Sequence, residues 1–256
     1  MLPYKMNPLG ISVSENIPLT FTAEQENSTV TLNKTGSPTV SGLHYRLGKS
    51  GLWLPYTPET TITLTNTGDS VQFWNSVDSL NLGNSHRVQF AMTGAISASG
   101  TIQSLLNFGK VCKSNSFYQL FGSCTSLLSA PELTAETIEG LGMANTFRGC
   151  GNMTGTVILQ ATTFTGESSC LAAFYATGIS GIELKATQLA TGCLAYAFYG
   201  SSSLSRVEVA FTEWLSGATT GWMTSTAAGG TFVKPAALPN SPGTSGIPSG
   251  WTIIDK

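Results

Sequence analysis

Apolar residues recur at a regular spacing along the second half of the chain. Four phenylalanines, Phe121, Phe147, Phe174 and Phe198, are separated by 26, 27 and 24 residues. Each is followed by a small polar turn and then an apolar residue, in the segments GSCTSL, RGCGNM, YATGI and YGSSSL. A period of this length indicates a solenoid, in which one unit cannot bury its own apolar face and successive units stack.

A short extended segment follows each turn: SAPEL, GTVIL, GIELK and RVEVA. In the last three, apolar residues alternate with polar ones, which is the period of a strand with one buried face. The alternating residues are Val157 and Leu159, Ile182 and Leu184, and Val207 and Val209. Stacking these units predicts a parallel sheet with strands about 4.8 Å apart. A short stretch able to form a helix then leads to the next phenylalanine.

Both ends of the repeat region carry segments that suit caps. Residues 86–106 predict two strands leading into the stack at its N-terminal end. The Pro- and Gly-rich segment from residue 230 onward ends in Trp251, Ile253 and Ile254, which we expect to point inward and cover the open apolar column.

Within a module bounded at residues 17–86, residues 17–75 show a different pattern of short alternating strands broken by Gly, Pro, Asn and Asp. This pattern predicts a small antiparallel β-sandwich, with TNTGDS as a hairpin turn in which Gly68 adopts a positive φ. The expected core is aromatic: Tyr45, Trp53, Tyr56, Phe73 and Trp74. An exposed ring of this set could instead hold a sugar, although core packing is the favoured use. Residues 1–16 match neither part and are interpreted as an extended arm.

The composition excludes several classes of protein. Charged residues make up 10 % of the chain and hydrophobic ones 41 %, too apolar for a disordered chain and too rich in turn and β-compatible residues for a helical bundle. The net charge of −2 without any run of Lys or Arg argues against nucleic acid as a partner. No uninterrupted apolar stretch is long enough for a membrane span. The first residues lack a signal-peptide pattern, so the protein stays where it is made or a leader was removed.

Reactive residues do not form a catalytic or metal-binding pattern. The five cysteines are odd in number and contain no CxxC pair, which favours reduced, buried, structural thiols over a disulfide framework or a zinc site. Neither His44 nor His86 has neighbours that suggest nucleophilic catalysis or a metal pair. We therefore expect no catalytic residue, no cofactor and no metal.

Two sets of residues are candidates for a partner surface. Glu132, Glu183 and Glu208 occupy the same place in their repeats, with Ile158 in the remaining unit. Stacking would place Glu183 beside Glu208, and like charges directly opposite each other destabilise a sheet. The row of glutamates could therefore bind a cation or a basic partner. Screening by flanking Lys185 and Arg206 is the favoured alternative.

The second set is aromatic and lies beside the repeated phenylalanines: Tyr118, Tyr175, Tyr196 and Tyr199. Partial burial along the convex side is the favoured interpretation of these tyrosines, and contact with a partner the alternative.

The repeat resembles the BspA-like leucine-rich-repeat family over roughly residues 87–256. That family's F-x-x-C-x-S-L … A-P-x-L-x-A-T-x-L unit is similar to FGSCTSLLSAPELTAETI and, more loosely, to FRGCGNMTGTVILQATTF. The ending GTFVKPAALP … GIPSGWTII also resembles the family's usual finish. Later units depart from the pattern, because the Cys after the Phe is lost and Ala-Pro survives only at Ala130-Pro131.

This resemblance implies surface display and binding or adhesion rather than catalysis.

The predicted architecture is mainly β with short helices: an arm (1–16), a β-sandwich module (17–86) and a BspA-type leucine-rich-repeat solenoid (87–256). The predicted function is a non-enzymatic virion component of a gut-bacterial phage, in a fibre, tail or capsid, that presents the repeat surface to host or mucosal glycans. The alternative is a bacterial cell-surface adhesin. Arm and module would contact other virion or cell-surface proteins, and fibre-like virion proteins suggest, by analogy, a trimer.

Overall fold

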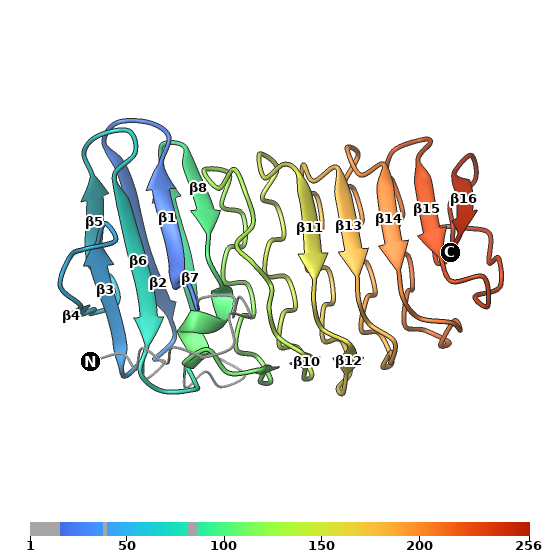
Figure 1. Ribbon diagram of the computed structural model, residues 1–256, viewed down its shortest axis with the longest axis horizontal. Coiled ribbons are helices and arrows are strands. Elements are labelled where there is room, and N and C mark those ends of the chain that lie inside the picture. The colour runs from blue at the N-terminus through green and yellow to red at the C-terminus, as the bar shows by residue number, and fades with distance from the viewer. Residues whose placement is uncertain (1–15, 38–39, 81–85) are drawn as a thin grey trace, which may run out of the picture.

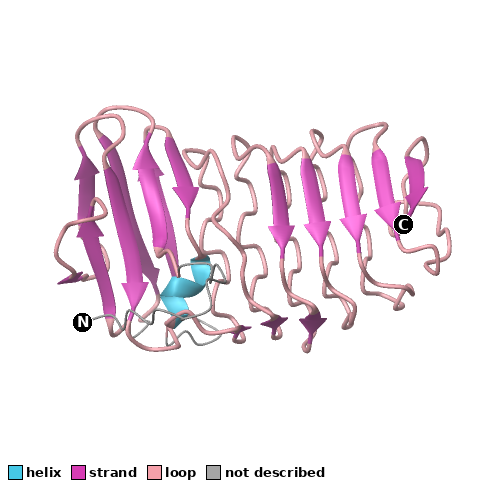
Figure 2. Cartoon of the chain, in the orientation of Figure 1, coloured by secondary structure: helices cyan, strands magenta, loops and turns pink. Residues whose placement is uncertain are grey.

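The protein forms an elongated, mainly β molecule, in which antiparallel sheets at the N-terminal end continue into a solenoid of about six turns (Figure 1). The computed structural model describes residues 16–37, 40–80 and 86–256. Within them the only helical element is the 3-10 helix η1, Ile102–Leu106, and turns fill most of the remaining chain (Figure 2). The predicted arm lies almost wholly outside the described residues.

Two antiparallel sheets make up the N-terminal part. The five-stranded sheet has the order β4-β3-β6-β1-β8, with β4 (Leu54–Pro55), β3 (Leu43–Leu47), β6 (Ser70–Asn75), β1 (Leu19–Ala23) and β8 (Ile96–Ser99). The three-stranded sheet has the order β5-β2-β7, with β5 (Thr61–Leu64), β2 (Ser28–Thr35) and β7 (Arg87–Thr93).

Aromatic rings from both sheets meet in the N-terminal core. Phe21 and Phe73 of the first sheet lie 4.9 and 5.3 Å, centroid to centroid, from Phe90 of the second. Tyr56 and Phe73 are buried as expected, whereas the sequence pattern did not single out Phe21 and Phe90. The two strands predicted between residues 86 and 106 exist as β7 and β8, and they hydrogen-bond to β2 and β1.

Two expectations about this region are wrong. The TNTGDS turn, whose Gly68 has the expected positive φ of 88°, is not a hairpin: it carries the chain from β5 in one sheet to β6 in the other. Trp53 and Trp74 are only half-buried and pack on each other with their ring centroids 6.0 Å apart, outside the core. The alternation of side chains along a strand explains why Trp74 lies outside the core. Trp74 is the register partner of His44, and His44 lies between the inward-facing Leu43 and Tyr45 of β3, so both His44 and Trp74 are on the outward face of the sheet.

The repeat region forms the predicted parallel sheet. It has the order β11-β13-β14-β15-β16, with β11 (Thr156–Leu159), β13 (Gly181–Leu184), β14 (Arg206–Val209), β15 (Thr231–Lys234) and β16 (Thr252–Asp255). A second, narrow parallel sheet has the order β12-β10-β9, with β12 (Thr163–Phe164), β10 (Thr137–Ile138) and β9 (Val111–Cys112). The alternating residues of β11, β13 and β14 are buried as predicted.

The phenylalanines form the predicted column. We number the coils by these residues, so that coils 1 to 4 contain Phe121, Phe147, Phe174 and Phe198. Consecutive rings are stacked with centroids 5.2, 5.3 and 5.9 Å apart. Phe90 continues the column at 5.4 Å from Phe121, so the core of the solenoid and that of the N-terminal sheets are one cluster.

The expected short helices before each phenylalanine are absent from the described coils, where a ribbon of turns takes their place. Every fourth residue of this ribbon has a positive φ, whether or not it is glycine. These residues are Asn115, Gln119, Ser123, Leu141, Asn145, Gly149, Ser168, Ala172, Ala176, Gly192, Tyr196, Gly200, Gly217, Gly221 and Ser225.

Hydrogen bonds between coils explain why the ribbon is not helical. The Phe147 N–H donates to the Ala173 carbonyl of the next coil at 2.8 Å, and alternate residues along the ribbon make the same kind of bond. The residues in between close local turns, as in the 3.1 Å bond from the Arg148 N–H to the Asn145 carbonyl. An α-helix would direct all these amides along its own axis, and the bonds between coils would be lost.

The C-terminal segment is only partly as expected. Trp251 is buried, and its indole N–H donates to the Ala227 carbonyl at 3.1 Å. Ile253 and Ile254 do not point into a covered core, since 38 % and 45 % of their surfaces are exposed. They lie on β16, which borders β15 on one side and no other described strand, so their side chains are covered from one side only.

All five cysteines are buried and free, as predicted. Cys124 and Cys150 begin a column beside the phenylalanines, and Thr177 and Ser201 take the same place in coils 3 and 4. The Cys150 thiol donates to the Phe121 carbonyl of the preceding coil at 3.0 Å, and the Ser201 hydroxyl donates to the Phe174 carbonyl at 2.7 Å. In coil 4 Ser201 therefore makes the same bond as Cys150, whereas the Thr177 hydroxyl of coil 3 donates to the Phe174 carbonyl of its own coil at 3.0 Å.

Burial of these thiols predicts sensitivity to alkaline pH. Burial raises the pKa of Cys150 to about 12, above the value of about 8.5 for an unfolded cysteine. The buried neutral thiol therefore contributes its full stabilisation of the folded state below about pH 8.5. This contribution is lost as the pH rises toward the pKa of Cys150 in the folded protein. Between pH 7 and 9.5 the wild type should lose about 1.4 kcal/mol more unfolding free energy than Cys150→Ser, measured by urea denaturation. Equal losses in the two proteins would contradict this prediction.

Candidate functional site

The strand face of the solenoid carries the predicted row of glutamates. Ile158, Glu183 and Glu208 are register partners on β11, β13 and β14. Glu132 belongs to the same row, because the adjacent Leu133 is bridged to Leu159 in the next coil. The sequence thus placed all four residues of the row correctly relative to one another.

Two of the three glutamates are neutralised within the protein. Glu183 forms an ion pair with Lys185. Glu208 pairs with Lys256 at 2.7 Å and with Arg206 at 2.9 Å, and the hydrogen bond from Lys256 is the main cause that lowers the pKa of this carboxyl. The flanking cations therefore screen the adjacent carboxylates, as the favoured alternative expected.

Glu132 differs from the other two. Its side chain is exposed, and no cation among the residues that the structure describes forms an ion pair with it. Its neighbour in the row is the apolar Ile158, 41 % exposed, in place of a second charge. Glu132 is thus a carboxylate that remains available to a ligand.

A groove of about 520 Å³ opens beside Glu132, between coils 1 and 2. It is bordered on one side by residues 129–134 and on the other by residues 154–158 and 160. Backbone bonds join the two sides at the ends, from Thr154 to the Leu128 carbonyl at 2.9 Å and from Gln160 to the Leu133 carbonyl at 3.1 Å.

Local sequence explains the groove. Proline has no N–H to donate to a sheet ladder, and Pro131 stands where the strand of coil 1 would run beside β11. Residues 129–131 accordingly leave the strand conformation, while Glu132 turns its backbone to the other side, where it bonds with Gly100 and Ile102. The sheet is interrupted at this point, between β8 and β11 in Figure 1.

Polar groups available to a ligand gather at this groove. The side chains of Glu132, Thr156 and Gln160 are exposed, and none forms a hydrogen bond with another described residue. Ile158 adds an exposed apolar surface beside them. Such a combination of a few polar groups with an apolar wall is typical of binding sites for small organic ligands.

The turn-rich side of the coils carries a second cluster, which we call the Arg–Tyr ladder: Arg148, Tyr175, Tyr199 and Tyr196. The Tyr175 and Tyr199 rings are parallel within 4°, with centroids 5.0 Å apart, and the Arg148 guanidinium lies 4.6 Å above the Tyr175 ring. Tyr196 contacts Tyr199 edge to face at 6.3 Å. Three of the four predicted tyrosines are thereby brought together.

Tyr118 lies apart from this ladder, contrary to the grouping expected from the sequence. Its hydroxyl accepts a 3.4 Å hydrogen bond from Gln119, and it lies on coil 1, whereas the ladder occupies coils 2 to 4. Arg148 is the member that sequence reasoning missed. The signal was present, since Arg148 follows Phe147 as Tyr175 follows Phe174 and Tyr199 follows Phe198.

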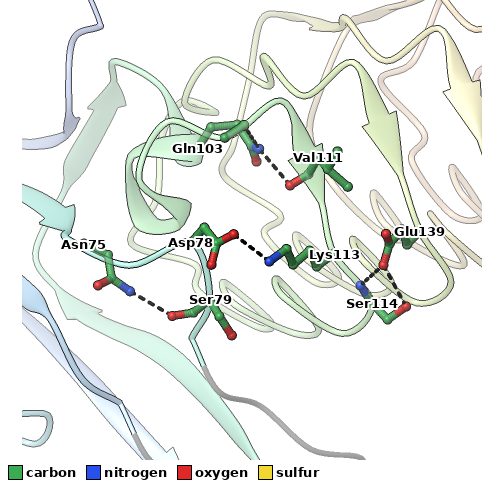
Figure 3. Close-up of polar contacts among 9 residues, drawn as sticks. Asn75, Asp78, Ser79, Gln103, Val111, Lys113, Ser114 and Glu139 are labelled. Carbon is green, nitrogen blue, oxygen red and sulfur yellow. Dashed lines mark hydrogen bonds and ion pairs between the residues drawn. The ribbon is translucent and has the colours of Figure 1, made fainter.

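A third polar cluster joins the N-terminal sheets to the first coils (Figure 3). Lys113 pairs with Asp78 at 2.7 Å, the Ser114 N–H donates to Glu139 at 3.0 Å, and the Gln103 amide donates to the Val111 carbonyl at 3.4 Å. These bonds link the bend after β6 and the helix η1 to the start of coil 1, and coil 1 to coil 2, so we assign the cluster a structural role.

The histidines lie far from both candidate surfaces in the sequence. His44 bonds through Nδ1 with the Gly42 carbonyl at 2.7 Å, and His86 accepts from the Ser37 N–H at 2.9 Å. Residues 16–37, 40–80 and 86–256 contain no group of three or more His, Cys, Asp or Glu able to hold a metal ion. In the same ranges, no helix has the length and apolarity needed to cross a bilayer.

Fold and surfaces together define a β-solenoid with a grooved strand face and an aromatic, cationic ladder on its turn side. Comparison with models of protein families, with curated proteins and with solved structures finds no match to this chain.

Proposed function

We propose that the protein is a non-enzymatic, BspA-like leucine-rich-repeat protein displayed on a surface, where its solenoid binds host or mucosal glycans. In this proposal the two N-terminal sheets form a β-sandwich module that, with the N-terminal arm, attaches the protein to other surface components. The repeat motif around Phe121 and the stacking of its later copies support the family assignment.

The groove beside Glu132 is the observation that carries the proposal. Its volume of about 520 Å³ lies within the range of roughly 300–1,000 Å³ for small-molecule sites. A carboxylate and an amide are good partners for sugar hydroxyls, and the exposed face of Ile158 suits the apolar face of a sugar ring. Because Glu132 has no ion-pair partner among the described residues, a ligand need not displace an internal cation to reach it.

The favoured setting is a virion of a gut-bacterial phage, in a fibre, tail or capsid-attached position, where fibre-like proteins suggest a trimer. Buried, reduced thiols suit assembly in a reducing compartment. The alternative setting is a bacterial cell surface, where the same groove would serve an adhesin. An export signal encoded upstream of Met1 would favour the adhesin, and structural virion genes on either side of the coding sequence would favour the phage.

Binding of the full chain to a glycan array tests the proposed function. Glu132→Gln should lower the affinity for the best-bound glycan at least tenfold, because the substitution removes the charge from the rim of the groove while keeping the shape of the side chain. Glu183→Gln is the matched control, since Glu183 lies in the same row but is paired with Lys185, and it should change affinity less than twofold. Absence of binding to every glycan, or equal losses in the two variants, would overturn the proposal.

A further inference from the structure

We infer that the Arg–Tyr ladder is a second ligand site, which binds an acidic saccharide, meaning a sugar that carries a carboxylate. This inference goes beyond the proposed function and does not depend on it. The ladder lies in the turn ribbon of coils 2 to 4, whereas the groove is on the strand face between coils 1 and 2, and the two sites share no residue.

Backbone bonds between coils hold the ladder in register. The carbonyl of Arg148 accepts from the Ser123 N–H at 2.6 Å, that of Tyr175 from the Gly149 N–H at 2.8 Å, and that of Tyr199 from the Ala176 N–H at 2.8 Å. Arg148, Tyr175 and Tyr199 thus occupy the same position on their coils, and Tyr196 lies beside Tyr199 on coil 4. The ladder is therefore fixed by the solenoid itself, so little ordering would be needed on binding.

Arg148 supplies a cation that the fold does not use. The residue is exposed, and no acidic side chain in the described ranges forms an ion pair with it. One guanidinium N–H donates to the Asn145 side chain at 3.3 Å, and the stacking on Tyr175 holds the group in place. The remaining N–H groups have the geometry that binds a carboxylate through two parallel hydrogen bonds.

The tyrosines supply the surface for the rest of the sugar. Tyr196 is 44 % exposed, and its ring packs closely over Gly221, where an added Cβ would lie only 3.0 Å from the ring. Tyrosine offers an apolar ring and a polar tip together, which matches the apolar face and the hydroxyls of a sugar. The ladder thus presents a carboxylate partner at one end and an amphipathic surface at the other.

The charge pattern favours a single carboxylate over a polyanion. Binding of a phosphate backbone depends on several clustered cations. The ladder has one, and the chain has a net charge of −2. A sugar acid needs only one guanidinium, so it fits the ladder where a nucleic acid does not.

Titration calorimetry with the full chain tests this inference. The probes are sialyllactose and lactose, which differ by the acidic sugar, and a galacturonic acid dimer, which distinguishes a uronic acid from a sialic acid. The wild type should bind at least one acidic probe at least tenfold more tightly than it binds lactose. Its affinity for that acidic probe should fall as the salt concentration is raised. Failure of both acidic probes to bind would overturn the inference.

Variants separate the ladder from general charge effects and from the groove. Arg148→Gln should lower the affinity for the acidic probe at least tenfold. Tyr196→Ala, which truncates an exposed side chain, should lower this affinity at least threefold. Lys110→Gln is the control, because it removes an exposed cation of coil 1 outside the ladder, and it should have no effect. Equal losses for Arg148→Gln and Lys110→Gln would overturn the inference, as would loss of acidic-probe binding in Glu132→Gln, which leaves the ladder unchanged.

Discussion

Replacing Phe147 by alanine should lower the free energy of unfolding by about 3–5 kcal/mol, the range for truncating a buried phenylalanine. The ring is fully buried, and it stacks on Phe121 at 5.2 Å and on Phe174 at 5.3 Å. It lies in the middle of the column, where rings of the coils on both sides cover its faces. Relaxation into the resulting cavity is limited, because backbone hydrogen bonds fix the spacing of the coils.

Urea denaturation followed by circular dichroism measures this effect, with Phe147→Leu as a partner variant. Leucine keeps much of the buried apolar area and should cost clearly less than alanine. The column is continuous with the N-terminal core through Phe90, so we expect one cooperative transition in which both regions unfold together. A loss below about 1 kcal/mol for Phe147→Ala would be typical of a surface residue and would contradict the stacked column.

Replacing Gly178 by alanine should lower the free energy of unfolding by about 2–3 kcal/mol, as expected for overpacking between rigid segments. A Cβ at this position would lie 2.5 Å from the Gly151 carbonyl oxygen and 3.1 Å from the Met153 carbonyl oxygen. Both obstacles are backbone atoms of the preceding coil, so no side chain can move aside. The substitution must separate coils 2 and 3 locally and weaken the hydrogen bonds between them.

Gly151 is the matched control, because it occupies the same position one coil earlier. A Cβ there meets nothing within 4 Å, and its φ is not positive. Gly151→Ala should therefore leave stability unchanged within about 0.5 kcal/mol. Thermal unfolding of both variants in parallel provides the comparison, and equal shifts would show that close packing of the coils does not require glycine at residue 178.

The candidate surfaces were only partly predictable. The glutamate row follows from the repeat alone, because parallel strands in register bring equivalent residues side by side. The groove does not follow, since it depends on how the chain around Pro131 leaves the sheet, and a proline shows only that one donor is missing. Predicting the ladder requires the fact that the residue after each phenylalanine lies next to the equivalent residue of the neighbouring coil. The repeat spacing implied this arrangement. Arg148 was nevertheless missed, because the sequence was searched for residues of one type and Arg148 is not a tyrosine.

The sequence by itself determined the phenylalanine column, the parallel strands and the burial of the cysteines, because the repeat places the same apolar residue at the same point of every coil. The tertiary structure alone decided the turn ribbon, the connection of β5 to β6 across two sheets, and the half-exposure of Trp53 and Trp74. The physical reason is that these features depend on where backbone amides find partners and which face of a strand another sheet covers. Those partners lie on other coils or sheets, about which local sequence carries no signal.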